Sequence, residues 1–253
     1  MFANFPLLVF ALSLVVVALS AKVGDALRKK VSRVQEDVVV HDFGVVLTCA
    51  LTLLALIVGF TFSMAINRYD LRKNYEQVEG SAIDIEYIRA DLLPPSAASR
   101  AKELLRNYLE QRVLFYTTRD QHRLAEIDSD TAQLQNELWS TVRSAIAAVP
   151  PPLEGVVVTG MTDVVNSQIA TQAAWRNRIP VAAWILTLAI SIGCNTLIGY
   201  RARRTDWLVF LILPVVVSIS LLLIADLDSP RGGAIRVAPQ NLMSLSQYLH
   251  SLS

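Results

Sequence analysis

The side chains that could take part in transport or binding lie inside an otherwise apolar segment, residues 43–67. Thr48, Thr52, Ala55, Gly59 and Ser63 recur at intervals of four, three, four and four residues, so they share one face of a helix. Small residues allow membrane helices to pack closely. A row of hydroxyl groups also costs more against lipid than against water or protein, so the same face could line a pore. Both interpretations remain open from this pattern alone.

Two aromatic residues near the end of this segment extend the pore interpretation. Phe60 and Phe62 could form a hydrophobic constriction of the kind that gates a pore by dewetting. Arg68 follows at the end of the segment, where a cation would attract anions. The candidate pore-lining residues are therefore Thr48, Thr52, Gly59, Phe60, Phe62, Ser63, Asn67 and Arg68.

Residues typical of catalytic or metal sites do not form a recognisable group. His41, His122 and His250 are far apart and lack metal-ligand spacing. Cys49 and Cys194 both lie in apolar segments, where a cysteine packs as a small apolar residue. The phosphate-binding, dinucleotide-binding, serine-hydrolase and zinc-protease motifs are absent from the sequence. We therefore expect a protein that is not an enzyme and that holds no cofactor or metal.

The composition indicates a membrane protein. Of 253 residues, 53% are hydrophobic and 18% are charged, whereas a soluble domain has about 25% charged residues. Four stretches contain no charged residue: 1–21, 43–67, 179–200 and 207–225. Since about 20 apolar residues span a bilayer as a helix, each predicts a transmembrane helix and a lipid partner. The net charge of +1 argues against nucleic-acid binding.

These stretches divide the chain into four parts. Residues 1–67 hold the first two spans with a basic loop at 22–42, and residues 179–227 hold the other two. The first span lacks a basic leading segment, so we expect a retained helix rather than a signal peptide. Between these parts lies a charged helical extramembrane domain, 68–178, whose protein partner the sequence does not identify. A tail, 228–253, follows, in which residues 242–252 predict a short amphipathic helix that folds back on this domain.

Apolar spacing predicts the helices of the extramembrane domain. An N-cap at Ser96 would start the second helix after Pro94 and Pro95, and a turn is expected at 128–130. The buried face of the first helix is expected to comprise Tyr75, Val78, Ala82, Ile85 and Ile88.

Basic residues suggest an orientation in the membrane. Short loops rich in Lys and Arg stay in the cytoplasm, and the two short loops share eight of them: Lys22, Arg28, Lys29, Lys30, Arg33, Arg201, Arg203 and Arg204. The count predicts that both termini and the 68–178 domain are non-cytoplasmic. The reverse orientation remains possible, because Arg68, Arg72, Lys73, Arg176 and Arg178 flank the membrane on the other side.

Five motifs resemble a family of bacterial membrane proteins called bestrophin-like, labelled a domain of unknown function. The matching stretches are 59–65 with 68–70, 87–94, 104–108, 176–180 and 226–233, followed by 235–237. The resemblance covers about residues 40–250. It implies a place in the bacterial inner membrane and a distant likeness to bestrophins, which are pentameric chloride channels with four spans per subunit. In bestrophins the second span lines the pore and carries an aromatic constriction, and the termini and middle region are cytoplasmic.

Two functions follow as hypotheses. The first is an oligomeric, channel-like protein, passing anions, with the second span of several subunits around the pore. The second is a non-conducting scaffold or sensor whose helical domain binds a partner while the spans anchor it. No continuous row of ionisable groups crosses the predicted spans, which argues against a proton-coupled transporter and leaves a passive channel open.

Overall fold

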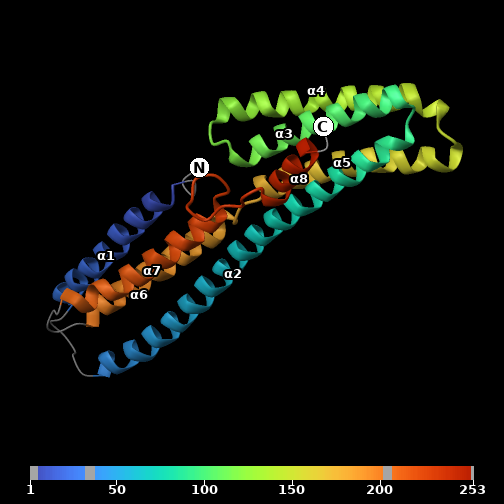
Figure 1. Cartoon of the computed structure of the whole chain (residues 1–253). Helices are drawn as coiled ribbons and strands as arrows, with labels where there is room; N and C mark the ends of the chain where they lie inside the picture. Colours follow the sequence, from blue (N-terminus) through green and yellow to red (C-terminus); the bar gives the residue numbers. More distant parts are fainter. Residues whose placement is uncertain (1–4, 32–37, 202–206, 252–253) are drawn as a thin grey trace. The chain divides into compact units, whose positions relative to one another are not determined.

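The computed structural model describes residues 5–31, 38–201 and 207–251, and this part of the chain is helical and contains no strand (Figure 1). The all-α class expected from the sequence is therefore confirmed. Two short 3₁₀ segments, η2 (Ala90–Leu92) and η3 (Ile146–Ala148), follow α2 and α4. The α-helices are α1 (Pro6–Val31), α2 (Val38–Arg89), α3 (Pro95–Thr117), α4 (Gln121–Ala145), α5 (Pro151–Arg176), α6 (Val181–Arg201), α7 (Trp207–Asp228) and α8 (Gln240–Ser251).

The chain divides into two compact units. The membrane unit comprises Met1–Tyr69 and Arg178–Arg236, and the helical unit comprises Asp70–Asn177 and Val237–Ser253. Within the described residues, four helical segments are long and apolar enough to cross a membrane, as the sequence predicted. These segments are Pro6–Lys30, Gly44–Leu92, Pro151–Tyr200 and Phe210–Asp228.

Helix α1 is longer than a membrane span requires. Its 26 residues extend about 39 Å at 1.5 Å per residue, against about 30 Å for the hydrocarbon core. Asp25 forms ion pairs with Arg28 at 2.8 Å and Lys29 at 2.6 Å on the next turn, and such pairs stabilise a helix. Residues 22–31 are therefore helical where the sequence suggested a loop, and two of the basic residues counted for orientation have an acidic partner.

Helices α1, α6 and α7 pack closely in the membrane unit. A Cβ atom at Gly24 would lie 2.0 Å from a backbone oxygen of α6, and one at Gly199 would lie 2.1 Å from a backbone oxygen of α1. Polar side chains bridge the same helices: Ser13 donates to Ser218 at 3.0 Å, and Asn195 donates to a backbone oxygen of α1 at 2.5 Å. Small residues and interhelical hydrogen bonds of this kind are typical of membrane bundles.

Helices α3 and α4 of the helical unit begin at positions that differ from the expectation. Pro94 is the N-cap of α3 and Pro95 occupies its first turn, where the missing N–H of proline costs nothing. Ser96 therefore lies inside the helix and is not its cap. The Asp120 side chain caps α4 by accepting a hydrogen bond from a first-turn N–H at 3.0 Å. Because α4 starts there, residues 128–130 are helical and the turn predicted for them is wrong.

The C-terminal helix α8 belongs to the helical unit. The buried Glu76 side chain on α2 accepts hydrogen bonds from the Asn241 side chain at 2.6 Å and from the Leu242 N–H at 3.0 Å. A carboxylate at a helix N-terminus satisfies free N–H groups and opposes the helix dipole. Leu242 and Leu249 are fully buried. The predicted amphipathic helix, folded back on the domain, is present.

Candidate pore face of helix α2

Helix α2 runs without interruption through 52 residues. In the membrane unit, the rest of the chain covers little of α2. Only 11% of the most apolar stretch of α2 is buried, whereas 39% of the most apolar stretch of α7 is buried. Leu54 and Ala65 lie on the covered side, in apolar clusters with α6 and α7. The candidate stripe lies outside these clusters, although two of its members border α7, and all of its members are exposed: Thr48, Thr52, Ala55, Gly59 and Ser63.

Two hydroxyl groups of this stripe are satisfied within the helix. Thr48 donates to the backbone oxygen of Gly44 at 3.0 Å, and Thr52 donates to that of Thr48 at 2.9 Å. Such bonds to the preceding turn lower the cost of placing a hydroxyl group in an apolar environment. These two hydroxyl groups therefore need no hydrogen bond from another helix.

The two candidate aromatic residues lie on different flanks of the helix. Phe60 is 62% exposed, whereas Phe62 is 37% exposed and borders a groove of about 440 Å³ between α2 and α7. Ala55 and Gly59 line the same groove. Phe60 instead begins a line of exposed residues spaced by three and four, which continues with Ser63 and Asn67. The structure therefore brings Phe60, Ser63 and Asn67 together on one exposed line and separates Phe62 from it.

Arg68 is not on this exposed line. It is half-buried, and its Nε atom is buried without a hydrogen-bond partner among the described residues. Successive residues of a helix are rotated by about 100° about its axis, so Arg68 points well away from Asn67. Its side chain is less available to a passing anion than the sequence suggested.

In the helical unit, α2 reverses the face expected from its sequence. Val78, Ile85 and Ile88 were expected to be buried, but they are 45%, 47% and 63% exposed. The buried side carries four charged residues instead, each at most 2% exposed: Arg72, Glu76, Glu79 and Glu86. The prediction assigned charged residues to water, which is where they normally lie. It fails because other helices of the unit surround the charged side.

The exposed apolar residues of α2 follow a seven-residue repeat. Leu71, Val78 and Ile85 are seven residues apart, and Ile88 follows three residues later. This spacing is typical of a helix that packs along another helix. The described residues of the same chain leave this row uncovered.

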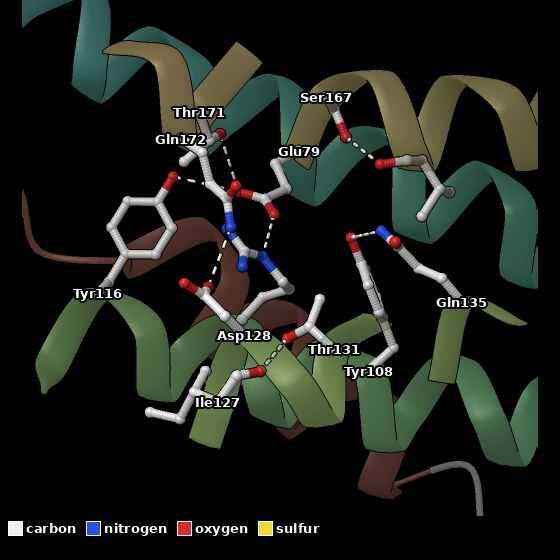
Figure 2. Close-up of polar contacts among 12 residues, drawn as sticks. Glu79, Tyr108, Tyr116, Ile127, Asp128, Thr131, Gln135, Ser167, Thr171 and Gln172 are labelled. Atoms are coloured by element: carbon white, nitrogen blue, oxygen red, sulfur yellow. Dashed lines mark hydrogen bonds and ion pairs between the residues drawn. The ribbon is translucent and has the colours of Figure 1, made fainter. Parts of the chain in front are cut away.

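A buried polar cluster joins three helices around Glu79. One carboxylate oxygen accepts a very short hydrogen bond from Arg112 Nε of α3, within a fully buried ion pair. The other accepts hydrogen bonds from Tyr116 at 3.2 Å and from Thr171 of α5 at 3.0 Å. Figure 2 shows the hydroxyl groups of Tyr116 and Thr171 directed at this carboxylate. The Arg112 guanidinium group also lies 4.4 Å from the centre of the Phe115 ring.

The tyrosine and arginine side chains of this cluster keep their ordinary protonation states at neutral pH. Burial, assisted by the Glu79 carboxylate, raises the pKa of both Tyr108 and Tyr116, so their phenols stay neutral. Burial lowers the pKa of Arg112, but Glu79 together with Tyr108 and Tyr116 outweighs that effect, and the net shift is upward. The cluster is a stable ion pair with neutral donors, and its role is to hold α2, α3 and α5 together.

The 226–233 motif begins in the last turn of α7 and continues into a structured turn after it. Asp226 accepts hydrogen bonds from the N–H groups of Ala234 and Ile235, both at 2.7 Å. Asp228 accepts one from the Ile179 N–H at 3.0 Å, which fixes the start of α6 to the end of α7. A Cβ atom at Gly233 would lie 2.7 Å from the backbone oxygen of Asp226. These residues act within the membrane unit as a structural clamp.

Comparison with known proteins places this fold in a family. A model of the Bestrophin-like domain matches residues 7–242. The chain therefore belongs to the Bestrophin-like family.

Solved structures share the fold at low sequence identity. A bacterial bestrophin homologue from Klebsiella pneumoniae is 13% identical, with 96% of this chain and 97% of that chain covered at a TM-score of 0.66. A single-substitution variant of that homologue is 14% identical, with 95% and 97% covered at a TM-score of 0.67. A second variant is 12% identical, with 96% of each chain covered at a TM-score of 0.68. No curated protein matches this chain.

Proposed function

We propose that this multi-span membrane protein is an oligomeric ion channel that passes anions, with the exposed face of α2 from several copies around a central pore. The likeness to the bestrophin homologues supports this proposal at the level of the fold. The bestrophin resemblance supports the choice of anions. The proposal treats the protein as a passive conductor and not as an enzyme.

One observation carries the proposal: in each of the two units the described residues leave one face of α2 uncovered. In the membrane unit this face is small or hydroxylated, and lipid, water or protein can cover it. In the helical unit it is apolar at Leu71, Val78, Ile85 and Ile88, and lipid does not reach a domain rich in charged residues. A row of exposed apolar residues of this kind marks an interaction site. A second copy of the same helix, repeated in a closed ring, covers the row in every subunit.

The exposed line of Phe60, Ser63 and Asn67 is the best candidate for the narrow part of the pore. Phe60 supplies a large apolar side chain that the rest of the subunit leaves exposed. Such a side chain suits a constriction that gates by dewetting. Thr48 and Thr52 continue the pore face along the membrane segment. Gly59 and Phe62 border the groove toward α7 and therefore contribute at the edge of the pore. Arg68 contributes charge near the pore mouth but does not face the ion directly.

The bacterial inner membrane is the proposed location, and two orientations compete. The count of basic residues favours non-cytoplasmic termini and helical unit, although the pairing of Asp25 with Arg28 and Lys29 weakens that count. The bestrophin resemblance favours the reverse orientation.

Cysteine labelling in intact cells decides between the two orientations. A cysteine is introduced at the exposed Ser144 and treated with a reagent that does not cross the inner membrane. The Ser144→Cys variant is labelled only if the helical unit is non-cytoplasmic.

Native mass spectrometry of the detergent-purified protein tests the oligomer. The channel proposal predicts a single closed species of four or more copies, because fewer α2 helices cannot enclose a central pore. A monomer or dimer would contradict it. That result would favour the scaffold or sensor, in which a different protein covers the exposed row on the helical unit.

A further inference from the structure

Glu86 is a buried carboxyl group that the proposed channel function does not use. It lies near the end of α2, beyond the apolar membrane segment, and is 2% exposed. Its Oε2 atom is buried and has no hydrogen-bond partner among the described residues. A buried acceptor without a donor is costly when it carries a full negative charge and much less costly when it carries a proton.

A glycine on α5 makes room for this carboxyl group. A Cβ atom at Gly160 would lie 1.8 Å from Glu86 Oε2. Glu86 therefore packs directly on the α5 backbone, at a point where any side chain would displace it. The absence of a side chain at Gly160 is the condition for burying Glu86 between the two helices.

Two charged groups act on Glu86. Arg89 lies one turn further along α2 and favours the ionised form, whereas Asp163 on α5 disfavours it. Arg89 and Asp163 lie 4.0 Å apart and are both partly exposed, so Arg89 is shared between the two carboxylates. Burial, assisted by Asp163, outweighs the effect of Arg89 and raises the pKa of Glu86 to about 8.

We propose that Glu86 is a proton-binding site that holds α5 against α2 when it is neutral and loosens this contact when it ionises. The inference goes beyond the proposed channel activity, because it concerns the packing of the helical unit and stands whether or not the protein conducts.

The sign of the pH dependence follows from linkage. The ordinary pKa of 4.5 rises to about 8 in the folded protein, so the native state binds this proton roughly 3,000-fold more tightly than the unfolded state. Between these two values the native state holds more protons than the unfolded state. The Glu86 contribution to stability therefore falls as the pH rises from about 4.5 to about 8 and stays constant above that range.

Thermal unfolding of the full-length protein in detergent, measured from pH 5 to pH 9, tests the inference. The wild type is expected to lose thermal stability across this range. The Glu86→Gln variant, which mimics the neutral acid, is expected to lose much less and to be the more stable protein at pH 9. Glu126→Gln is the control, because Glu126 is 61% exposed, and its profile should follow the wild type. Parallel wild-type and Glu86→Gln profiles would overturn the proposal.

Hydrogen exchange at a fixed pH tests the contact itself, and comparison at one pH cancels the intrinsic exchange rate. At pH 9 the α5 peptides around Gly160 should exchange faster in the wild type than in Glu86→Gln, and at pH 6 the two should agree. Gly160→Ala should displace the carboxyl group and remove the pH dependence, whereas Gly155→Ala, with nothing within 4 Å of the new Cβ atom, should preserve it. Equal α5 exchange in the wild type and Glu86→Gln at pH 9 would refute the loosening step.

Infrared titration of the wild type keeps the inference testable if the Gln variant fails to fold. A carbonyl band of a protonated carboxyl group should persist at pH 7 and fall to half its intensity near pH 8. Its complete loss below pH 6 would show that Glu86 is ionised at neutral pH and would overturn the proposal.

Discussion

The Ile85→Asp variant is expected to purify as a monomer. Ile85 is 47% exposed on the outward side of α2 and is the third residue of the seven-residue repeat, after Leu71 and Val78. In a ring of identical subunits the substitution places one carboxylate in every interface. An unpaired charge buried at an interface costs several kcal/mol, and the repeated negative charges also repel each other. Native mass spectrometry of the variant beside the wild type measures the loss of the oligomer.

Met243→Asp is the matched control for this prediction. Met243 is 45% exposed, close to the value for Ile85, but it lies on α8 and outside the α2 row. An aspartate in the first turn of a helix is also favourable to the helix dipole. The control should therefore keep the oligomer of the wild type. An Ile85→Asp protein that is folded and as oligomeric as the wild type would contradict the assignment of α2 as the subunit interface.

The Arg112→Ala variant is expected to lose about 3–5 kcal/mol of stability, because it leaves the Glu79 carboxylate buried without its cation. Tyr116 and Thr171 still donate to Glu79 but cannot neutralise its charge. Thermal unfolding of the full-length protein beside the wild type measures this loss.

Arg100→Ala is the control for the buried pair. Arg100 also pairs with acidic residues, Glu103 at 3.0 Å and Glu137 at 2.9 Å, but its side chain is 48% exposed. Exposed pairs contribute about 0–1 kcal/mol, so this variant should unfold close to the wild type. Adding Glu79→Gln to Arg112→Ala should restore part of the lost stability, because the unpaired charge is removed. Equal small effects of Arg112→Ala and Arg100→Ala would show that the buried pair does not hold α2 to α3.

The membrane layout was predictable because it depends on length and charge alone. A charge-free stretch such as 43–67 has one low-energy arrangement in lipid, a helix, and the four segments capable of spanning follow directly. The short helix near the C-terminus was predictable for a similar reason. Its apolar residues Leu242 and Leu249 lie on one face, and both are buried.

The orientation of α2 in the helical unit was not predictable from its own residues. Apolar spacing correctly placed Val78, Ile85 and Ile88 on one side of a helix. The same spacing is expected whether that side is covered by the rest of the same chain or by another chain. Glu79 is buried only because Arg112, Tyr116 and Thr171 are distant in sequence and close in space. The charged residues at 72, 76, 79 and 86 have the spacing of one face of a helix. This spacing was the only sign in the sequence that the charged side of α2 could be buried.

The candidate pore residues divide in the same way. The sequence placed Phe60 and Phe62 together because they are close along the chain, whereas two residues of helix are a rotation of about 200°. Only the position of α7 shows that Phe62 borders a groove within the subunit. The sequence shows the spacing that places Phe60, Ser63 and Asn67 on one side of the helix. It does not show which helices pack against α2, so it could not tell which side of α2 is exposed.

Current through the purified oligomer in a planar bilayer tests the proposed channel function, with Phe60→Ala and Phe62→Ala measured beside the wild type. We expect an anion-selective current in the wild type. Phe60→Ala should have a clearly larger single-channel conductance, because the constriction widens, and Phe62→Ala should show a smaller change. An intact oligomer that passes no current, or a conducting protein in which Phe60→Ala leaves conductance and selectivity unchanged, would contradict the proposal.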